Sequence, residues 1–322
     1  MELPGFHDIE MAHERIRKVI HRTPVMTCRG IDAICGVSLF FKCENFQKVG
    51  AFKFRGASNA VLSMTKEEIS GGVATHSSGN HAAALALAAS QRGVPCYIVM
   101  PRTAPGIKKK AVEAYGGIIT FCEPTLEARE STLNQVVEKT GAVVVHPYNN
   151  PWVIAGQGTA SLELLRDVPD LDAVIAPVGG GGLLSGTTIC AKSLKPDIQV
   201  IGAEPAMADD AMRSLREGRI IPSVNPRTIA DGLLTSLGSI TFAVLSAYNT
   251  TILTTSEENI VRAMQLIWER MKIIAEPSSA VALAIILEHS GYFRENFSRV
   301  GIILSGGNVD LQNLPFAPAI PA

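Results

Sequence analysis

The chain has 322 residues, of which 47% are hydrophobic and 18% are charged, with a formal net charge of −1. Such a length is ample for a large core in one or two domains. The near-neutral charge gives no reason to expect a nucleic acid or a membrane surface as partner, and no apolar run is long enough to cross a membrane. The six cysteines are scattered without a C-x-x-C pair, which is typical of reduced thiols in the cytoplasm.

Short β-branched segments alternate with Ala- and Leu-rich segments along most of the chain. The predicted strands fall within 72–78, 95–101, 118–124, 142–147, 171–178, 198–205 and 299–307, and the predicted helices within 79–93, 104–117, 125–141, 156–168, 182–196, 256–271 and 278–291. This order favours an α/β fold with parallel sheets covered by helices. The four strands and three helices between Val73 and Pro147 can form a small sheet of their own. The longest irregular stretch is 221–239, and long loops are often functional.

Lys53 stands between two phenylalanines in the stretch GAFKFRGA, residues 50–57. A surface lysine needs no such neighbours, whereas a lysine held in a partly desolvated pocket does, because burial lowers its pKa. A neutral amine is a nucleophile that can form a Schiff base with a carbonyl. The alternative is an amphipathic segment whose phenylalanines are core and whose lysine reaches the surface. The eight residues alone do not decide between the two.

Glycine-rich or polar turns follow three of the predicted strands, at 77–81 (SSGNH), 179–186 (GGGGLLSG) and 305–308 (SGGN). The four consecutive glycines of the second turn expose backbone N–H groups at the start of a helix, where a phosphate fits best. The turn is neither a Walker motif nor G-x-G-x-x-G. Glu204 lies about 20 residues further on, where a ribose-binding acid would stand, so a dinucleotide site stays open as an alternative. A purely structural turn is the other alternative.

A nucleophilic lysine combined with a phosphate-binding loop suggests pyridoxal phosphate (PLP), whose aldehyde reacts with the lysine and whose phosphate meets the glycines. The chain also resembles a known family, the fold-type II PLP enzymes, and within it the serine racemase and serine/threonine dehydratase group. The resemblance covers nearly the whole chain. It rests on FFKCENFQKVGAFKFRGA, THSSGNHAAAL, YIVMPRTAP, VIAGQGT, PVGGGGLLSG, AEPAMADDA, TIADG, WERMKIIAEPSSAV and LSGGNVDL, in this order. THSSGNH, WERMK and SGGNVDL are most similar to eukaryotic-type serine racemase.

The resemblance implies a tryptophan synthase β-like architecture, an α/β fold of two domains with parallel-type twisted sheets flanked by helices. The large PLP-binding domain would comprise residues 1–71 and 149–322, and the small domain residues 72–148. The resemblance also implies a homodimer that acts on a small hydroxy amino acid such as serine, threonine or 3-hydroxyaspartate.

The family pattern also assigns the contacts to the cofactor. Lys53 would form the Schiff base, and the serine that meets the pyridine nitrogen can hydrogen-bond it but cannot keep it protonated. The ring is then a moderate electron sink, suited to brief carbanions at Cα and to loss of a β-hydroxyl. The implied cofactor contacts are Phe52 on the ring, Asn80 at the ring hydroxyl, Gly179, Gly180, Gly181 and Gly182 at the phosphate, Ser305 at the nitrogen, and Tyr148 near the domain junction.

Ser78 separates the activities within this group. In the family the serine at this position faces the lysine across the substrate Cα, and two bases on opposite faces allow racemisation, whereas members with alanine there mainly eliminate. The resemblance therefore implies a serine racemase that also acts as a serine/threonine dehydratase. The alternative for Ser78 is a helix N-cap. The substrate α-carboxylate would be received by the loop of Ser77, Ser78, Gly79, Asn80 and His81.

Arg129 matches a position that contacts small dicarboxylates in serine racemases, although an arginine there also suits a solvated helix face. If Arg129 reaches the site, threo-3-hydroxyaspartate becomes the rival substrate, and the enzyme would be its dehydratase.

Glu204 and Asp210 follow a predicted strand, and the resemblance implies that their carboxylates and the Ala208 carbonyl bind Mg²⁺, Mn²⁺ or Ca²⁺. Oxygen ligands suit such hard cations. The plain alternative is an acid-rich helix start, which the helix dipole favours. Mammalian-type serine racemases bind ATP at a subunit interface, and ATP is an effector to consider here, although no local motif decides it.

Two hypotheses come from other classes. The glycine turn and Glu204 could serve a dinucleotide-binding oxidoreductase, and the chain could also be an amino-acid-binding module without catalysis. A visible absorption band from a lysine Schiff base would separate the PLP enzyme from both.

Overall fold

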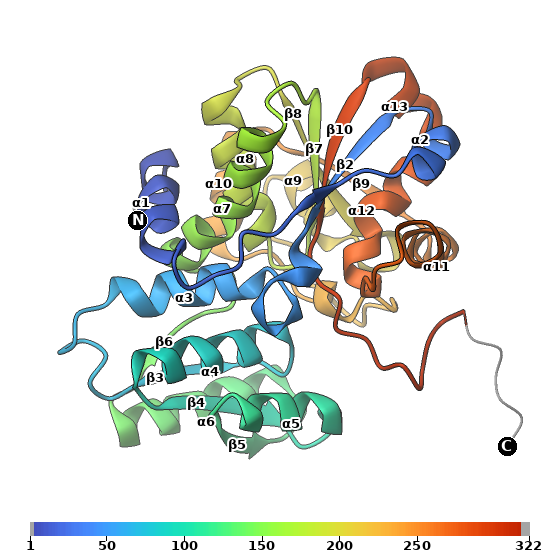
Figure 1. Ribbon diagram of the computed structural model, residues 1–322. Helices are drawn as coiled ribbons and strands as arrows, with labels where there is room; N and C mark the ends of the chain where they lie inside the picture. Colours follow the sequence, from blue (N-terminus) through green and yellow to red (C-terminus); the bar gives the residue numbers. More distant parts are fainter. Residues whose placement is uncertain (1–2, 317–322) are drawn as a thin grey trace, which may run out of the picture.

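The computed structural model describes residues 3–316, within which two β-sheets stand one above the other (Figure 1). The larger has the strand order β1-β2-β10-β7-β8-β9 and the smaller the order β5-β4-β3-β6. Neighbouring strands are parallel except β1, which runs antiparallel to β2. The strand bounds are Val25–Met26 (β1), Ser38–Cys43 (β2), Val73–His76 (β3), Cys96–Pro101 (β4), Ile118–Cys122 (β5), Val143–Val144 (β6), Ala173–Pro177 (β7), Gln199–Pro205 (β8), Thr251–Thr255 (β9) and Arg299–Leu304 (β10).

Helices cover both faces of the larger sheet, which explains why a central strand such as β7 is apolar at every position and entirely buried. Helices α1, α7, α8, α9 and α10 pack on one face, and α2, α11, α12 and α13 on the other. Their bounds are Phe6–Ile16 (α1), Arg29–Cys35 (α2), Pro151–Asp167 (α7), Gly182–Leu194 (α8), Asp210–Glu217 (α9), Ser239–Ala247 (α10), Glu257–Leu266 (α11), Pro277–Glu288 (α12) and Ser290–Asn296 (α13). Short 3-10 turns span Glu44–Phe46 (η1), Lys48–Gly50 (η2), Ala206–Ala208 (η3) and Asp231–Leu233 (η4).

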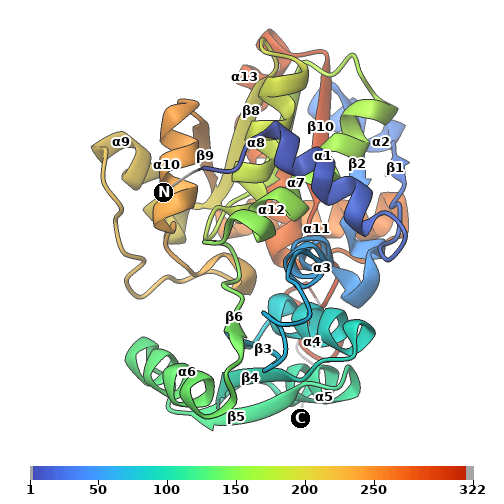
Figure 2. The same cartoon turned by 90° about the vertical axis from the view of Figure 1, so that its left-hand side faces the viewer.

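The smaller sheet carries α4 (Asn80–Arg92) and α5 (Gly106–Ala114) on one face and α6 (Leu126–Thr140) on the other. We call these strands and helices, β3 to β6 with α4 to α6, the small-sheet unit, and the rest of the described chain the large-sheet unit. Helix α3 (Lys53–Ser63) belongs to the large-sheet unit and faces the small-sheet unit, with α7 on one side of it and α4 on the other (Figures 1 and 2). The start of α3 is thus placed where the two units meet.

The α/β fold and the separate small sheet are confirmed. The domain boundaries before residue 72 and after residue 148 stay a prediction. One predicted element is wrong in detail, because the helix expected over 256–271 is α-helical only over Glu257–Leu266 and continues as a π-helical turn, Ile267–Met271. Lys272 then ends it in the left-handed conformation. Within residues 3–316, no helix is both long and apolar enough to cross a membrane.

Candidate active site

Lys53 is the first residue of α3 and points toward the chain that enters α7. Its Nζ donates a hydrogen bond to the carbonyl of Pro147 at 3.0 Å and lies 5.0 Å from the centroid of the Phe52 ring. Burial lowers the pKa of Lys53 to about 8, and the nearby carboxylate of Glu276 opposes part of that shift. More of the amine is therefore neutral and nucleophilic near neutral pH than in an ordinary lysine, although the protonated form still predominates below pH 8.

The segment before Lys53 is bonded to the turn that follows β10. The amide of Phe52 donates to the carbonyl of Ser305 at 2.9 Å, and the amide of Gly307 donates to the carbonyl of Gly50 at 2.9 Å. An antiparallel bridge joins Ala51 to Gly306 between them. The SGGN turn, with the predicted residue Ser305 buried in it, is therefore brought next to Lys53.

The four glycines at Gly179–Gly182 link β7 to α8, with Gly181 as the helix N-cap in the left-handed conformation, φ +86°. A side chain on Gly180 would lie 2.3 Å from the ring of Tyr148, and one on Gly181 would lie 2.8 Å from Leu237 and Thr241. Within residues 3–316, none of the four glycine N–H groups donates to a backbone or side-chain acceptor. Free N–H groups on a crowded, side-chain-free turn at a helix start fit a phosphate group.

The segment Pro147–Tyr148 connects these two features. The Pro147 carbonyl accepts from Lys53, and the next residue, Tyr148, packs against Gly180 and Gly182. The Tyr148 ring also meets the ring of His146 edge to face, with 4.6 Å between the centroids. The lysine and the glycine turn, 126 positions apart from Lys53 to Gly179, thus contact the same short stretch of chain. The structure therefore brings together the two features that suggest PLP.

Asn80 opens α4 and is held by two residues that the sequence did not single out, Glu276 and Asn308. The Asn80 Nδ2 donates to both oxygens of Glu276, at 3.0 and 3.2 Å, and its Oδ1 accepts from the Asn308 Nδ2 at 3.0 Å. The Asn308 amide donates to Glu276 at 3.1 Å. Burial raises the pKa of Glu276 to about 7, although the Asn80 bond opposes the shift. Glu276 lies in the motif WERMKIIAEPSSAV. A glutamate before a proline indicates only the start of a helix, so the residues around Glu276 do not predict that it binds Asn80 and Asn308.

The SSGNH loop joins β3 to α4. Ser77, Ser78 and Gly79 are partly exposed, and the helix N-cap is Gly79, not Ser78, so the N-cap alternative for Ser78 is wrong. His81 behaves differently from the residues before it, because its ring is buried and its Nε2 contacts the carbonyl of Val145 at 3.1 Å. Burial lowers the pKa of His81 to about 3, which keeps the ring neutral. The His81 ring is therefore bonded into the small-sheet unit.

Arg129 lies on α6, on the same side as the end of β3. Its side chain is partly buried, and its Nε is buried without a partner in the described part of the chain. Burial lowers the pKa of His76, the residue before Ser77; the charge of Glu130 opposes this shift and that of Arg129 adds to it. Arg129 is thus not on a fully solvated helix face.

Glu204, Ala208 and Asp210 gather at the end of β8 and are all buried. Both carboxylate oxygens of Glu204 accept backbone bonds from α9, from Ala211 at 2.8 Å and Met212 at 2.9 Å, whereas Asp210 Oδ2 has no partner among residues 3–316. A cavity of about 290 Å³ adjoins Ala208 and Asp210. In the described residues no three His, Cys, Asp or Glu side chains cluster around a metal position, and this set has only two carboxylates with a carbonyl.

Comparison with known proteins agrees with this geometry. The family model described as "Pyridoxal-phosphate dependent enzyme" matches residues 16–306. The serine racemase of Dictyostelium discoideum is 53% identical over 309 residues, 95% of each chain, and the beta-hydroxyaspartate dehydratase of Paracoccus denitrificans is 52% identical over 316 residues, 98% of this chain and 100% of the other. The crystal structure of the Dictyostelium discoideum enzyme superimposes with a TM-score of 0.92, covering 96% of this chain and 99% of that chain. The chain therefore belongs to the fold-type II family of pyridoxal-phosphate dependent enzymes.

Proposed function

We propose that this protein is a PLP-dependent serine racemase that also removes water from serine and threonine, giving a 2-oxo acid and ammonia. The observation that carries the proposal is the junction at Pro147–Tyr148, where the amine of Lys53 and the glycine turn contact one segment. The identity of 53% to a serine racemase supports the choice of reaction within the family.

Each residue has a role in this proposal. Lys53 holds the cofactor aldehyde, the amides of Gly179–Gly182 bind the phosphate, Asn80 and Ser305 bind the ring hydroxyl and nitrogen, and Phe52 packs on the ring. When bound, PLP supplies an electron sink for charge that develops at the substrate Cα. The hydroxyls and amides of Ser77–Asn80 orient the substrate carboxylate. His81 belongs to this loop by position, although its ring contributes by bracing the small-sheet unit.

Proton transfer in the proposal uses Lys53 on one face of the Cα and Ser78 on the other. Removal by one and return by the other inverts the centre, whereas loss of the β-hydroxyl gives the elimination products. Because Gly79 and not Ser78 caps α4, no helix end engages the Ser78 hydroxyl as its cap. A bifunctional enzyme is expected, since both outcomes begin with the same proton removal.

The second candidate is a threo-3-hydroxyaspartate dehydratase on the same scaffold. It is favoured by the buried, partnerless Nε of Arg129 within the described residues, since a second substrate carboxylate would pair with it. The 52% identity to a beta-hydroxyaspartate dehydratase supports it as well.

One experiment separates the two candidates. The purified protein, loaded with PLP and Mg²⁺, is incubated with L-serine in D₂O and followed by proton NMR and chiral chromatography. Deuterium at Cα with accumulating D-serine supports the racemase, and pyruvate without D-serine leaves only the dehydratase. No exchange with serine, but oxaloacetate and ammonia from hydroxyaspartate, would replace the first candidate by the second.

We further propose that Glu204, the Ala208 carbonyl and Asp210 bind a divalent cation of the Mg²⁺, Mn²⁺ or Ca²⁺ type. The buried Asp210 oxygen without a partner in residues 3–316 fits such an ion, because a buried carboxylate is costly unless it is paired. Its role would be structural or activating, not chemical. Chelation should lower the melting temperature of the native protein and leave that of Asp210→Asn unchanged.

The proposal is completed by a cytoplasmic homodimer with ATP as an effector, both taken from the family resemblance. Sedimentation of the native protein with and without ATP tests the assembly, and titration of activity with ATP tests the effector.

A further inference from the structure

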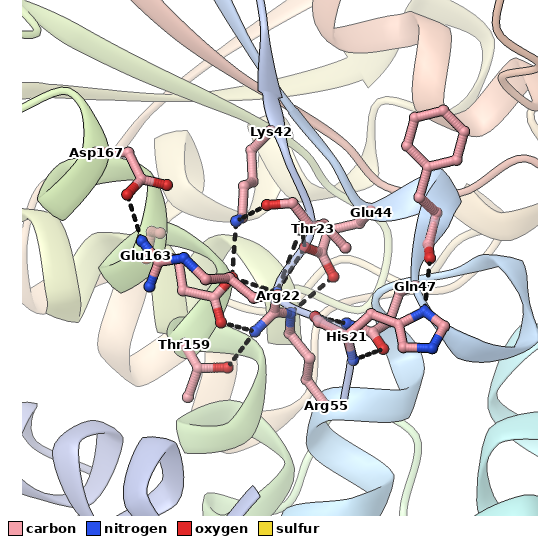
Figure 3. Close-up of polar contacts among 12 residues, drawn as sticks. His21, Arg22, Thr23, Lys42, Glu44, Gln47, Arg55, Thr159, Glu163 and Asp167 are labelled. Atoms are coloured by element: carbon pink, nitrogen blue, oxygen red, sulfur yellow. Dashed lines mark hydrogen bonds and ion pairs between the residues drawn. The ribbon is translucent and has the colours of Figure 1, made fainter. Parts of the chain in front are cut away.

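Four charged side chains lie buried at the seam between β2, α3 and α7 (Figure 3). Lys42 is the last residue but one of β2, Glu44 is in η1, Arg55 is in the first turn of α3, and Glu163 is on α7. All four are at most 2% exposed. We call them the charge quartet. It has two positive and two negative members, so its formal charges balance.

Arg55 is the centre of the charge quartet. It binds Glu44 in a fork, with Nε to Oε2 at 2.7 Å and Nη2 to Oε1 at 2.8 Å. It binds Glu163 in a second fork, with Nη1 to Oε1 at 2.9 Å and Nη2 to Oε2 at 2.8 Å. Nη1 also donates to the Thr159 hydroxyl at 3.2 Å. Two forks on one planar guanidinium fix the position and the direction of the side chain.

Lys42, on β2, is the second positive member of the charge quartet and pairs with Glu163. Its Nζ lies 2.7 Å from Glu163 Oε2 and donates to the carbonyl of Thr23 at 2.6 Å. The Thr23 hydroxyl in turn donates to Glu44 at 2.5 Å. Each charge therefore meets an opposite charge. Lys42, Glu44 and Arg55 also have a neutral partner, whereas Glu163 bonds to Arg55 and Lys42. A buried network that is satisfied in this way is rigid.

The backbones of α3 and α7 touch immediately beside Arg55. A side chain on Gly56 would lie 2.7 Å from the carbonyl of Val153, and one on Gly156 would lie 2.6 Å from the Cα of Gly56. The amide of Gly56 donates to Gln157 at 3.1 Å. The close crossing sets the distance between the helices, and the charge quartet prevents α3 from sliding or turning on α7.

Lys53 is two residues before Arg55, and its amine bonds to Pro147, four residues before α7 begins at Pro151. Helix α7 therefore binds Arg55 through Glu163, and the segment that leads into α7 carries the carbonyl that accepts from Lys53. In the described part of the chain no side chain caps the N-terminus of α3, so capping does not fix its first residue.

We propose that Arg55 and Glu163 are positioning residues that aim the Lys53 amine. A buried ion network contributes little net stability compared with apolar packing, so stability alone gives a weak reason for four buried charges beside this lysine. A role in orienting the Lys53 amine gives a stronger reason for these charges. The inference rests on the proposed Schiff-base role of Lys53, and its test distinguishes failure of one from failure of the other.

The test compares Glu163→Gln, which keeps the shape and removes one charge, with Val61→Ala, a buried truncation about two turns further along α3. Both variants, as PLP-loaded full chains, are measured for urea unfolding, for the visible lysine Schiff-base band, for PLP affinity, and for kcat and KM with L-serine. We expect both to unfold at lower urea. Only Glu163→Gln should weaken the band and PLP affinity and lower kcat by about 10- to 100-fold.

A Glu163→Gln variant with the native band, PLP affinity and kcat would overturn the inference and leave the charge quartet as scaffold only. The inference would also be overturned if Val61→Ala lost as much stability as Glu163→Gln and weakened the Schiff-base band to the same extent. If Glu163→Gln does not fold, Thr159→Val decides, because it removes one bond to Arg55 and keeps the volume: a weaker band supports the inference and a native band overturns it. A wild-type protein without the band, or a Lys53→Ala variant that keeps it, would instead refute the proposed function.

Discussion

The ammonium of Lys108, on α5 of the small-sheet unit, donates to the carboxylate of Asp231, in η4 of the large-sheet unit, at 2.5 Å. Both charges influence the pKa of Glu276, the acid that holds Asn80, so the ion pair is close to the candidate site. Asp231 is followed by Gly232 and Leu233, and the Leu233 backbone packs against Gly179. This pair thus joins the two units beside the glycine turn.

Reversing the charge of one partner should loosen the contact between the units. Exposed ion pairs contribute about 0.2–1 kcal/mol, so we expect Lys108→Glu or Asp231→Lys to lower kcat/KM roughly two- to fivefold. The double variant, which restores an opposite-charge pair, should recover most of the loss, and added salt should reduce the difference. Kinetics at low and high ionic strength measure both effects. A double variant that is worse than either single variant would contradict a direct interaction.

The Lys53 amine predicts how cofactor loading depends on pH. Its pKa is lowered from 10.5 to about 8, so the amine is protonated below pH 8 and free to add to an aldehyde above it. The rate at which PLP-free protein combines with PLP should therefore rise with pH and level off above about 8. Stopped-flow absorbance measures that rate.

The variant Glu276→Gln provides the control for that pH profile. The Glu276 carboxylate raises the pKa of Lys53, so its removal should move the midpoint of the profile below 8. A wild-type midpoint near 10.5 would show that the amine is solvated and would remove the basis of the prediction.

Among the four glycines of the turn, Gly180 is the one at which an added Cβ would come nearest to another atom. A Cβ there would lie 2.3 Å from the Tyr148 ring, so in Gly180→Ala either the ring or the turn must shift. We expect PLP affinity to fall at least about tenfold, because the amides of the turn no longer converge on one position. The matched control is Gly291→Ala, where a Cβ meets nothing within 4 Å in the described structure. Equilibrium dialysis of PLP against both variants makes the comparison, and equal affinities would contradict the assigned phosphate site.

Ser78→Ala should separate the two proposed reactions. Formation of D-serine from L-serine should fall by about 100- to 10,000-fold, the usual contribution of a positioned acid or base. Loss of water from L-serine should continue, because Lys53 still removes its proton. Ser77→Ala, one residue away in the same loop, should keep the ratio of the two products near the wild-type value. If Ser78→Ala racemises normally, the second base is another group.

Strands β3 to β8 and β10 and helices α4 to α8, α11 and α12 could be predicted because their signals are local. Period, β-branching and turn glycines act over a few residues. The eight residues around Lys53 do not by themselves decide its role, which is predicted only together with the glycine turn and the family resemblance. The partners of Asn80 could not be predicted in this way, since Glu276 is 196 positions away. Arg55 and Glu163 are likewise 108 positions apart, and each alone is an ordinary charged residue.

The misassigned details have physical causes as well. The N-cap alternative for Ser78 is wrong because α4 begins at Asn80, which makes Gly79 the N-cap and leaves Ser78 one residue too early. The π-helical turn at Ile267–Met271 replaces the expected α-helix where Trp268 donates to the carbonyl of Ala275. Such local rewinding depends on tertiary contacts that no periodicity encodes.

The position of α3 has a consequence for dissecting the protein. Its buried residues Phe54, Ala57, Ala60 and Val61 share one apolar cluster with α4 and β4, although α3 precedes the residues predicted as the small domain. A fragment of residues 72–148 would therefore expose the face of α4 that α3 covers, and it should aggregate when expressed by itself. A fragment that begins at residue 53 keeps that face of α4 covered and should aggregate less. Any graft of this module onto another host would have to carry α3 with it.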